Sequence, residues 1–199
     1  MTVVVLVVHG CGPGPEVASV PSDSTLLRDI RQRVADDQAI RDSFALELRT
    51  TGTISPHVFE RMRSVDSANI AWLRPFIDAA HLPTKKMVGA EGMAALLLLI
   101  QHADQDTTLQ ATALPLVEAA FRAGDVQGQE YAMLTDRVLK ARGRLQRYGT
   151  QATIEGGMVR IDPIEDSVGV DARRAELGML PLFEYKRVLD SVYARAQSN

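Results

Sequence analysis

The segment from Ala90 to Ala103 constrains the fold most strongly, because it is apolar on every side. It contains Met93, the leucine run 96–99 and Ile100, whereas its single acidic residue is Glu91. A helix that is apolar all round must be covered by other parts of the protein. The apolar run is also far shorter than the roughly 20 residues of a membrane-spanning helix. The sequence therefore predicts a central helix buried in the core of a globular domain.

Composition supports an ordinary globular protein. The chain has 199 residues, of which 46% are hydrophobic, and a formal net charge of −3. This length is sufficient to bury a core, and disorder would require fewer apolar residues and a larger net charge. The small net charge argues against nucleic acid as the main partner. The single cysteine, Cys11, excludes intramolecular disulfides and a zinc site made of cysteines alone.

Helical periodicity dominates from Asp23 onward. The hydrophobic spacing and the capping residues predict helices over 24–48, from Asp66 onward with a kink or break at Pro75, and over 90–103, 107–123, 127–141, 171–177 and from Pro181 onward. Thr50 to Ser55 is expected to be a loop. Residues 151–161 alternate around Gly156-Gly157, which predicts a β-hairpin. We expect a mainly α fold, a compact helical domain of about six helices with one small β-hairpin near residues 151–161, and a single helical domain over residues 25–199.

The N-terminus resembles the export signal of bacterial lipoproteins. An apolar run from Val3 to Val8 is followed by Gly10-Cys11, and in such proteins the cysteine becomes lipidated. The Gly- and Pro-rich stretch up to Ser22 would then be a flexible tether, so residues 1–24 are interpreted as a signal-like segment and tether. No basic residue precedes the run, and a buried first strand is the alternative. Two locations stay open: exported and lipid-anchored to the cell envelope through Cys11, or cytoplasmic.

Polar side chains follow the most apolar helix at its C-terminal end. Gln101 and His102 continue its inner faces, and Asp104 comes directly after. Buried polar groups need hydrogen-bond partners, because an unpaired group costs about 1–3 kcal/mol. We expect those partners to come from Asp136-Arg137, in a helix that is otherwise apolar on one face, and from the segment 148–151.

This set of residues could perform acid–base chemistry. His102 would be the general acid or base, because the ordinary pKa of histidine is near 6.5. Asp104 and Asp136 would orient its ring, and Tyr148 would donate a proton. The expected ligand-binding residues are Gln101, Arg137, Gln146 and Gln151. The spacing His102-x-Asp104-x-Asp106 does not place its ligands on one helix face, so no metal site is expected, and no cofactor motif is present.

Seven short motifs together resemble a bacterial family that is catalogued only as a domain of unknown function. They lie between about Asp66 and Tyr185 and comprise Val65-Asp66 with Asn69, Pro83-Thr84 with Val88-Gly89, Gln101-His102-Ala103-Asp104, Leu134-Thr135-Asp136-Arg137, Gln146 with Tyr148-Gly149-Thr150-Gln151, Pro163-Ile164-Glu165-Asp166, and Arg173-Arg174 with Leu177-Gly178, Pro181-Leu182 and Tyr185. The resemblance implies that the polar residues belong together. It adds Thr150, Arg173 and Arg174 to the ligand-binding candidates, and it implies no activity.

Three functional interpretations follow. The first is a small, metal-independent, hydrolase-like acid–base enzyme with a polar pocket centred on His102, which would bind a small polar or anionic ligand. The second is a non-catalytic domain of the cell envelope that binds a ligand or partner in the same pocket. The third is a purely structural network that fixes helix packing. All three require that distant stretches of chain bring their polar side chains together around His102.

Overall fold

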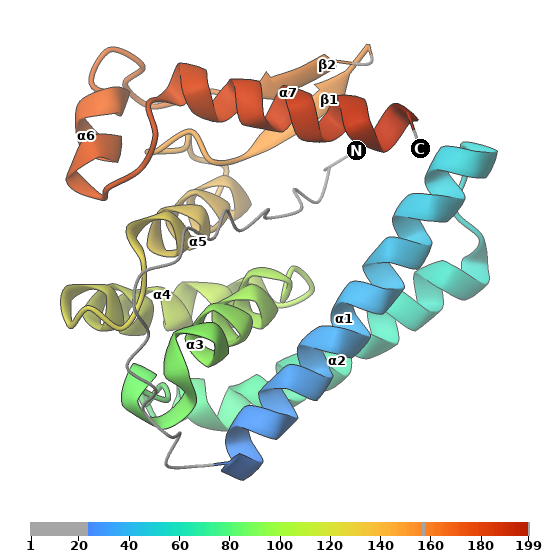
Figure 1. Ribbon diagram of the computed structural model, residues 1–199. Helices are drawn as coiled ribbons and strands as arrows, with labels where there is room; N and C mark the ends of the chain where they lie inside the picture. The colour runs from blue at the N-terminus through green and yellow to red at the C-terminus, as the bar shows by residue number, and fades with distance from the viewer. Residues whose placement is uncertain (1–23, 157, 199) are drawn as a thin grey trace, which may run out of the picture. The chain divides into compact units, whose positions relative to one another are not determined.

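The computed structural model describes residues 24–156 and 158–198 (Figure 1). Within these residues the chain forms seven helices and one two-stranded antiparallel sheet, which confirms the predicted mainly helical fold with a small hairpin. The predicted signal-like segment and Cys11 lie outside the described residues, so lipid anchoring stays a prediction. The described chain divides after Leu134 into two compact units, here called the N-terminal and the C-terminal unit.

The N-terminal unit is a set of packed helices. Helices α1 (Ser24–Thr51) and α2 (Pro56–Asp78) run antiparallel to each other. Helix α3 (Lys85–Gln101) packs against α1, and α4 (Thr107–Arg122) packs against α2 (Figure 1). The core between them contains fully buried residues from three helices: Ile30, Leu73, Leu96 and Ile100. As the sequence predicts, the most apolar helix, α3, is deeply buried.

Helix α2 begins earlier than predicted. The expected start at Asp66 is wrong, because α2 starts at Pro56. Ser55 caps the helix by accepting a hydrogen bond from the backbone N–H of Val58 (3.4 Å), and proline suits the first helical position because its ring already holds a helical φ. Pro75 lies inside the helix close to its C-terminal end, and the helix continues past it only to Asp78.

Helix α3 is interrupted near its start and ends at the candidate site. Gly89 has a φ of 74°, outside the helical range, so the continuous part of the helix follows it as predicted. At the other end His102 is the C-cap residue, and its N–H donates to the carbonyl of Leu98 (3.0 Å). Asp106 then caps α4 by accepting from the N–H of Leu109 (2.9 Å). These two caps place His102 in a short, tightly defined turn.

The C-terminal unit contains the hairpin and two further helices. The boundary between the units falls within α5 (Gly128–Ala141). Strands β1 (Ala152–Glu155) and β2 (Met158–Ile161) pair with Ala152 opposite Ile161. They are followed by α6 (Val170–Glu176) and by α7 (Leu182–Ser198), which packs on β2. A small apolar core lies between the hairpin and α7, formed by Ala152, Val159, Tyr185 and Leu189.

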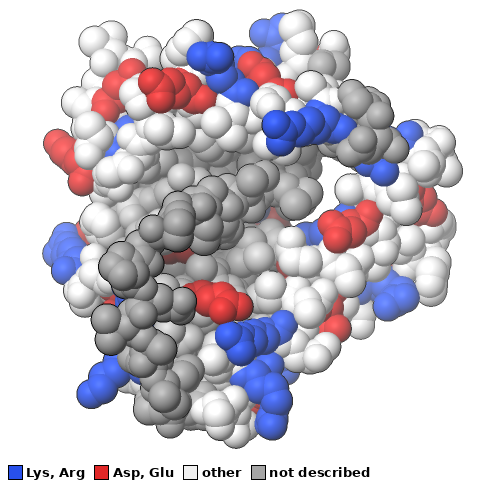
Figure 2. Space-filling view, viewed as in Figure 1, with Lys and Arg blue, Asp and Glu red and all other residues white. Residues whose placement is uncertain are grey.

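The surface carries charges of both signs. On the face shown in Figure 2, acidic and basic side chains are interspersed. Several form exposed ion pairs, including Arg31 with Glu91 (3.0 Å) and Lys186 with Asp190 (2.7 Å). Such exposed pairs contribute little to stability. None of the helices in the described ranges combines the length and the apolar character required to cross a bilayer.

Candidate functional site

Two charged residues of α1 occupy positions where apolar residues are expected. Residues 27, 30, 34, 37, 41 and 44 follow one another at spacings of three and four, which places them on the same face of the helix. Four of them are apolar, whereas the other two are Asp37 and Arg41. Asp37 is completely buried, and the side chain of Arg41 is only 10% exposed. This face of α1 therefore directs a carboxylate and a guanidinium group into the N-terminal unit.

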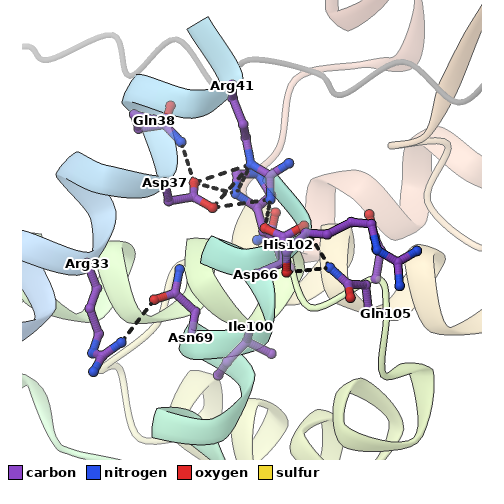
Figure 3. Close-up of polar contacts among 12 residues, drawn as sticks. Arg33, Asp37, Gln38, Arg41, Asp66, Asn69, Ile100, His102 and Gln105 are labelled. Atoms are coloured by element: carbon purple, nitrogen blue, oxygen red, sulfur yellow. Dashed lines mark hydrogen bonds and ion pairs between the residues drawn. The ribbon is translucent and has the colours of Figure 1, made fainter. Parts of the chain in front are cut away.

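These two residues join His102 and Asp66 in one network, here called the His102 network (Figure 3). Nδ1 of His102 lies 2.7 Å from Oδ2 of Asp37. The guanidinium of Arg41 donates from Nη2 to Oδ1 of Asp66 (2.7 Å), and it also forms an ion pair with Oδ1 of Asp37 (3.1 Å). The network thus combines groups from α1, α2 and the C-cap of α3.

Two charged side chains contact Nδ1 of His102. Oδ2 of Asp37 lies 2.7 Å away and accepts a hydrogen bond when Nδ1 carries the ring proton, whereas Arg41 donates to Nδ1 when this nitrogen is unprotonated. Nε of Arg41 lies 2.8 Å from the same Nδ1, but it can donate instead to the two oxygens of Asp37 at 3.2 and 3.3 Å. In the tautomer that donates to Asp37, any proton transfer between the imidazole and a bound molecule falls to Nε2.

The two carboxylates of the network have pKa values shifted in opposite directions. Burial raises the pKa of Asp66 to about 6, and the positive charge of Arg41 opposes this shift only in part. Burial would also raise the pKa of Asp37, but the hydrogen bond from His102 and the charges of His102 and Arg41 outweigh it and hold that pKa below its usual range. One carboxyl therefore stays ionised while the other titrates close to neutral pH.

The network approaches the surface beside Asp66. The side chains of Asp66 and His102 are each 8% exposed, whereas Gln105 is exposed. Nε2 of Gln105 donates to the carbonyl of Arg63 (3.1 Å) and contacts Oδ2 of Asp66 (3.5 Å). The hydroxyl of Ser67 donates to Oε1 of the same glutamine (3.3 Å). Gln105 is thus held over the outer edge of the network by weak, solvent-facing contacts.

A second polar pair lies one helical turn further along the same helices. On α1, Arg33 precedes Asp37, and on α2, Asn69 follows Asp66. Nη1 of Arg33 donates to Oδ1 of Asn69 (3.2 Å), and the guanidinium lies 4.9 Å from the centre of the Trp72 ring. Figure 3 shows this pair beside the His102 network.

A separate polar network in the C-terminal unit is centred on Asp136. Asp136 is completely buried on α5. Its carboxylate accepts hydrogen bonds from the backbone N–H groups of Arg147 (2.7 Å), Tyr148 (3.0 Å) and Thr150 (2.9 Å), and from the hydroxyl of Thr150 (2.8 Å). Burial is the largest influence on the pKa of Asp136 and raises it, while these donors lower it. The carboxylate organises the loop 146–151 because it satisfies several backbone donors at once.

Three more buried side chains hold the same loop. The amide of Gln146 donates to the carbonyls of Gln151 (3.1 Å) and Asp162 (2.6 Å). Nη1 of Arg174 donates to the carbonyl of Tyr148 (2.7 Å), and its guanidinium lies 4.8 Å from the centre of the Tyr185 ring. The hydroxyl of Tyr185 donates to the carbonyl of Thr150 (3.1 Å). The main chain of this loop is therefore fixed from several sides.

The predicted site residues fall into both units. Gln101, His102 and Asp104 belong to the N-terminal unit, where Nε2 of Gln110 donates to the carbonyl of Gln101 (3.0 Å) and to Oδ1 of Asp104 (3.2 Å). The other candidates belong to the C-terminal unit: Asp136, Arg137, Gln146, Tyr148, Thr150, Gln151, Arg173 and Arg174. Arg173 contacts the loop through Nε, which donates to the carbonyl of Arg147 (3.1 Å). A pocket shared by both groups stays a prediction.

The charged residues of α1 in the His102 network are not among the site residues predicted from the sequence. These residues are Asp37 and Arg41, whereas Asp66 and Asn69 of α2 belong to a motif of the family resemblance. The sequence does contain a feature that indicates them. Asp37 and Arg41 interrupt the apolar spacing of α1 in the same way that Asp136 interrupts that of α5. A charged residue on an otherwise apolar face requires a buried partner, and here the partner is the imidazole of His102.

The His102 network combines side chains of both charge signs. Among the described residues, no group of three or more His, Cys, Asp and Glu side chains is placed to hold a metal ion. The guanidinium of Arg41 lies within hydrogen-bonding distance of both Asp37 and Asp66 and supplies the positive charge between them. The donor set therefore consists of one imidazole, two carboxyl groups and one guanidinium.

Comparison with known proteins agrees with the motifs. No curated protein and no solved structure matches the chain. A family model does match, over residues 25–197, and it therefore extends the resemblance from the motif region to nearly all described residues. The model describes a family of unknown function, so the match assigns no activity to this protein. The chain belongs to this family, DUF6624.

Proposed function

We propose that this protein is a small acid–base catalyst of the hydrolase type, with His102 as the residue that transfers the proton. The observation that carries the proposal is the contact of 2.7 Å between His102 and the fully buried Asp37. A buried carboxylate that accepts from Nδ1 fixes the orientation of the ring and stabilises the imidazolium that forms when Nε2 takes a proton. Asp37 is a positioning residue in this scheme, since it acts through the imidazole.

Asp66 would supply the second proton-transfer group. Its pKa near 6 allows it to be protonated in weakly acidic solution, while Asp37 stays ionised. Two neighbouring groups whose environments separate their pKa values are typical of an acid and base pair. In hydrolysis, His102 would remove a proton from water as it attacks the substrate. Asp66 would then protonate the leaving group, and the activity should fall as the pH rises through about 6.

The test is hydrolysis of a panel of p-nitrophenyl acetate, phosphate and glycosides and of fluorogenic peptides. We expect H102Q to reduce the rate at least a hundredfold, which is the usual contribution of a general base. D37N should also reduce the rate while shifting its pH profile. H57Q removes an exposed histidine of α2 and is the matched control. Activity that is equal in H102Q and wild type, with both proteins folded by circular dichroism, would refute the proposal.

A structural role for the same network is the second candidate, because His102 is only 7% exposed. Buried polar networks often fix helix packing without any catalysis. In that case H102Q and D37N would lower the free energy of unfolding, and no substrate of the panel would be turned over faster by the wild type than by H102Q. The non-catalytic binding interpretation predicts a third result. H102Q and D37N would stay folded and would no longer bind a ligand, and the wild type would turn over no substrate.

A further inference from the structure

The amide of Asn69 has a buried donor for which the protein offers no acceptor. Asn69 is only 5% exposed, and its Nδ2 has no hydrogen-bond partner within the described part of the chain. The assignment of its two amide atoms is secure, because Arg33 can only donate and therefore requires Oδ1 on its side. An unpaired buried donor costs about 1–3 kcal/mol and is rare in native proteins.

The free donor lies on the opposite side of the Asn69 amide from the oxygen that accepts from Arg33. In Figure 3 the oxygen of Asn69 points toward Arg33, whereas the nitrogen points to the side on which Asp37 lies. Asp66, whose carboxyl group belongs to that network, precedes Asn69 by three residues on the same helix and is therefore its neighbour on the helix surface. An acceptor atom bound at Nδ2 would thus lie beside the groups proposed to transfer protons.

Arg33 carries a positive charge that no acidic side chain of the described residues neutralises through an ion pair. Arg41, in contrast, is shared between Asp37 and Asp66, and Arg31 is paired with Glu91. Arg33 is half-buried and packed on Trp72, and its guanidinium donates to Asn69 and to the carbonyl of Ala68 (3.4 Å). A partly buried cation beside an unused amide donor favours a negatively charged oxygen group.

We propose that Arg33 and Asn69 form a subsite for an oxyanion group, a carboxylate or a phosphate, on the molecule that reaches the His102 network. Asn69 donates from Nδ2 to one oxygen of this group, and Arg33 supplies the charge. The identity of the substrate class rests on the proposed function, whereas binding of the anion does not. The other occupant that chemistry allows is a single trapped water, which would satisfy the amide without any charge preference.

The experiment is a titration of the ¹⁵N-labelled full chain with sodium acetate and with sodium phosphate at constant ionic strength, followed by NMR. We expect a saturable shift of the Asn69 side-chain amide with at least one of the two anions, and the responding anion identifies the group. N69D keeps an acceptor for Arg33 but removes the donor, so it should fold and bind the anion at least tenfold more weakly. R33M should show a similar loss.

R31M is the matched control, because it removes an arginine of the same helix that is exposed and paired with Glu91. Its affinity for the anion should equal that of the wild type. The proposal is overturned if neither anion gives a saturable shift, if R31M weakens binding as much as R33M, or if N69D binds as tightly as the wild type. H102Q should retain anion binding, so loss of the proposed catalysis and loss of this subsite give different results.

Discussion

Replacing Asp66 by asparagine should change how stability depends on pH. The pKa of Asp66 is raised from its ordinary value of 3.8 to about 6 in the folded protein. Folding therefore favours the protonated carboxyl. The stability that this group contributes is fully present below pH 4 and is lost as the pH rises through 6. A shift of about two units corresponds to about 3 kcal/mol, at 1.36 kcal/mol per unit. Asparagine does not titrate in this range.

The assay is urea unfolding of wild type and D66N at several values between pH 4 and pH 7.5. The difference in the free energy of unfolding should move in favour of D66N by up to about 3 kcal/mol across this range. Taking the difference between the two proteins cancels the titrating groups that do not interact with Asp66. D42N, at an exposed position of α1, controls for the loss of one negative charge. A difference that is independent of pH, or that moves in favour of the wild type, would show that Arg41 outweighs burial at this site.

Two further predictions concern the loop 146–151. G149A should lower the free energy of unfolding by more than about 1 kcal/mol. Gly149 has a φ of 69°, and an added Cβ would lie 2.7 Å from Leu182. Unchanged thermal unfolding of G149A would contradict this prediction. D136N should cost about 2–3 kcal/mol, because the amide cannot accept all four hydrogen bonds, and it should expose the loop to limited proteolysis. Cleavage of D136N no faster than of wild type would contradict a loop-organising role.

Local pattern was sufficient to predict most of the helices and the hairpin. The hairpin follows from alternating residues around two glycines, and α4 and α5 follow from apolar spacing that ends near Gly124 and Gly143. The start of α2 was missed because its first turns carry few apolar residues, although Ser55-Pro56 is a clear start signal. Spacing alone could not detect a helix whose first turns are mostly exposed.

The site was only partly predictable, because charge pairing is a long-range property. His102 and Asp136 could be identified from one stretch of sequence each, since each interrupts an apolar pattern, and both are buried. Their partners come from elsewhere: Asp37 is 65 residues from His102, and Thr150 is 14 residues from Asp136. A single sequence states that a buried charge needs a partner, but it does not state which of several arginines and aspartates will fold against it.

The contact of Tyr185 with the loop has a consequence for synthesis of the protein. The hydroxyl that holds the carbonyl of Thr150 is carried by α7, which is synthesised after the loop that it contacts. The nascent chain therefore cannot form this hydrogen bond until Tyr185 has been synthesised. A product terminated before Tyr185 would lack this hydrogen bond to Thr150. Its loop 146–151 should therefore be less well held, and quality-control proteases should cleave it there.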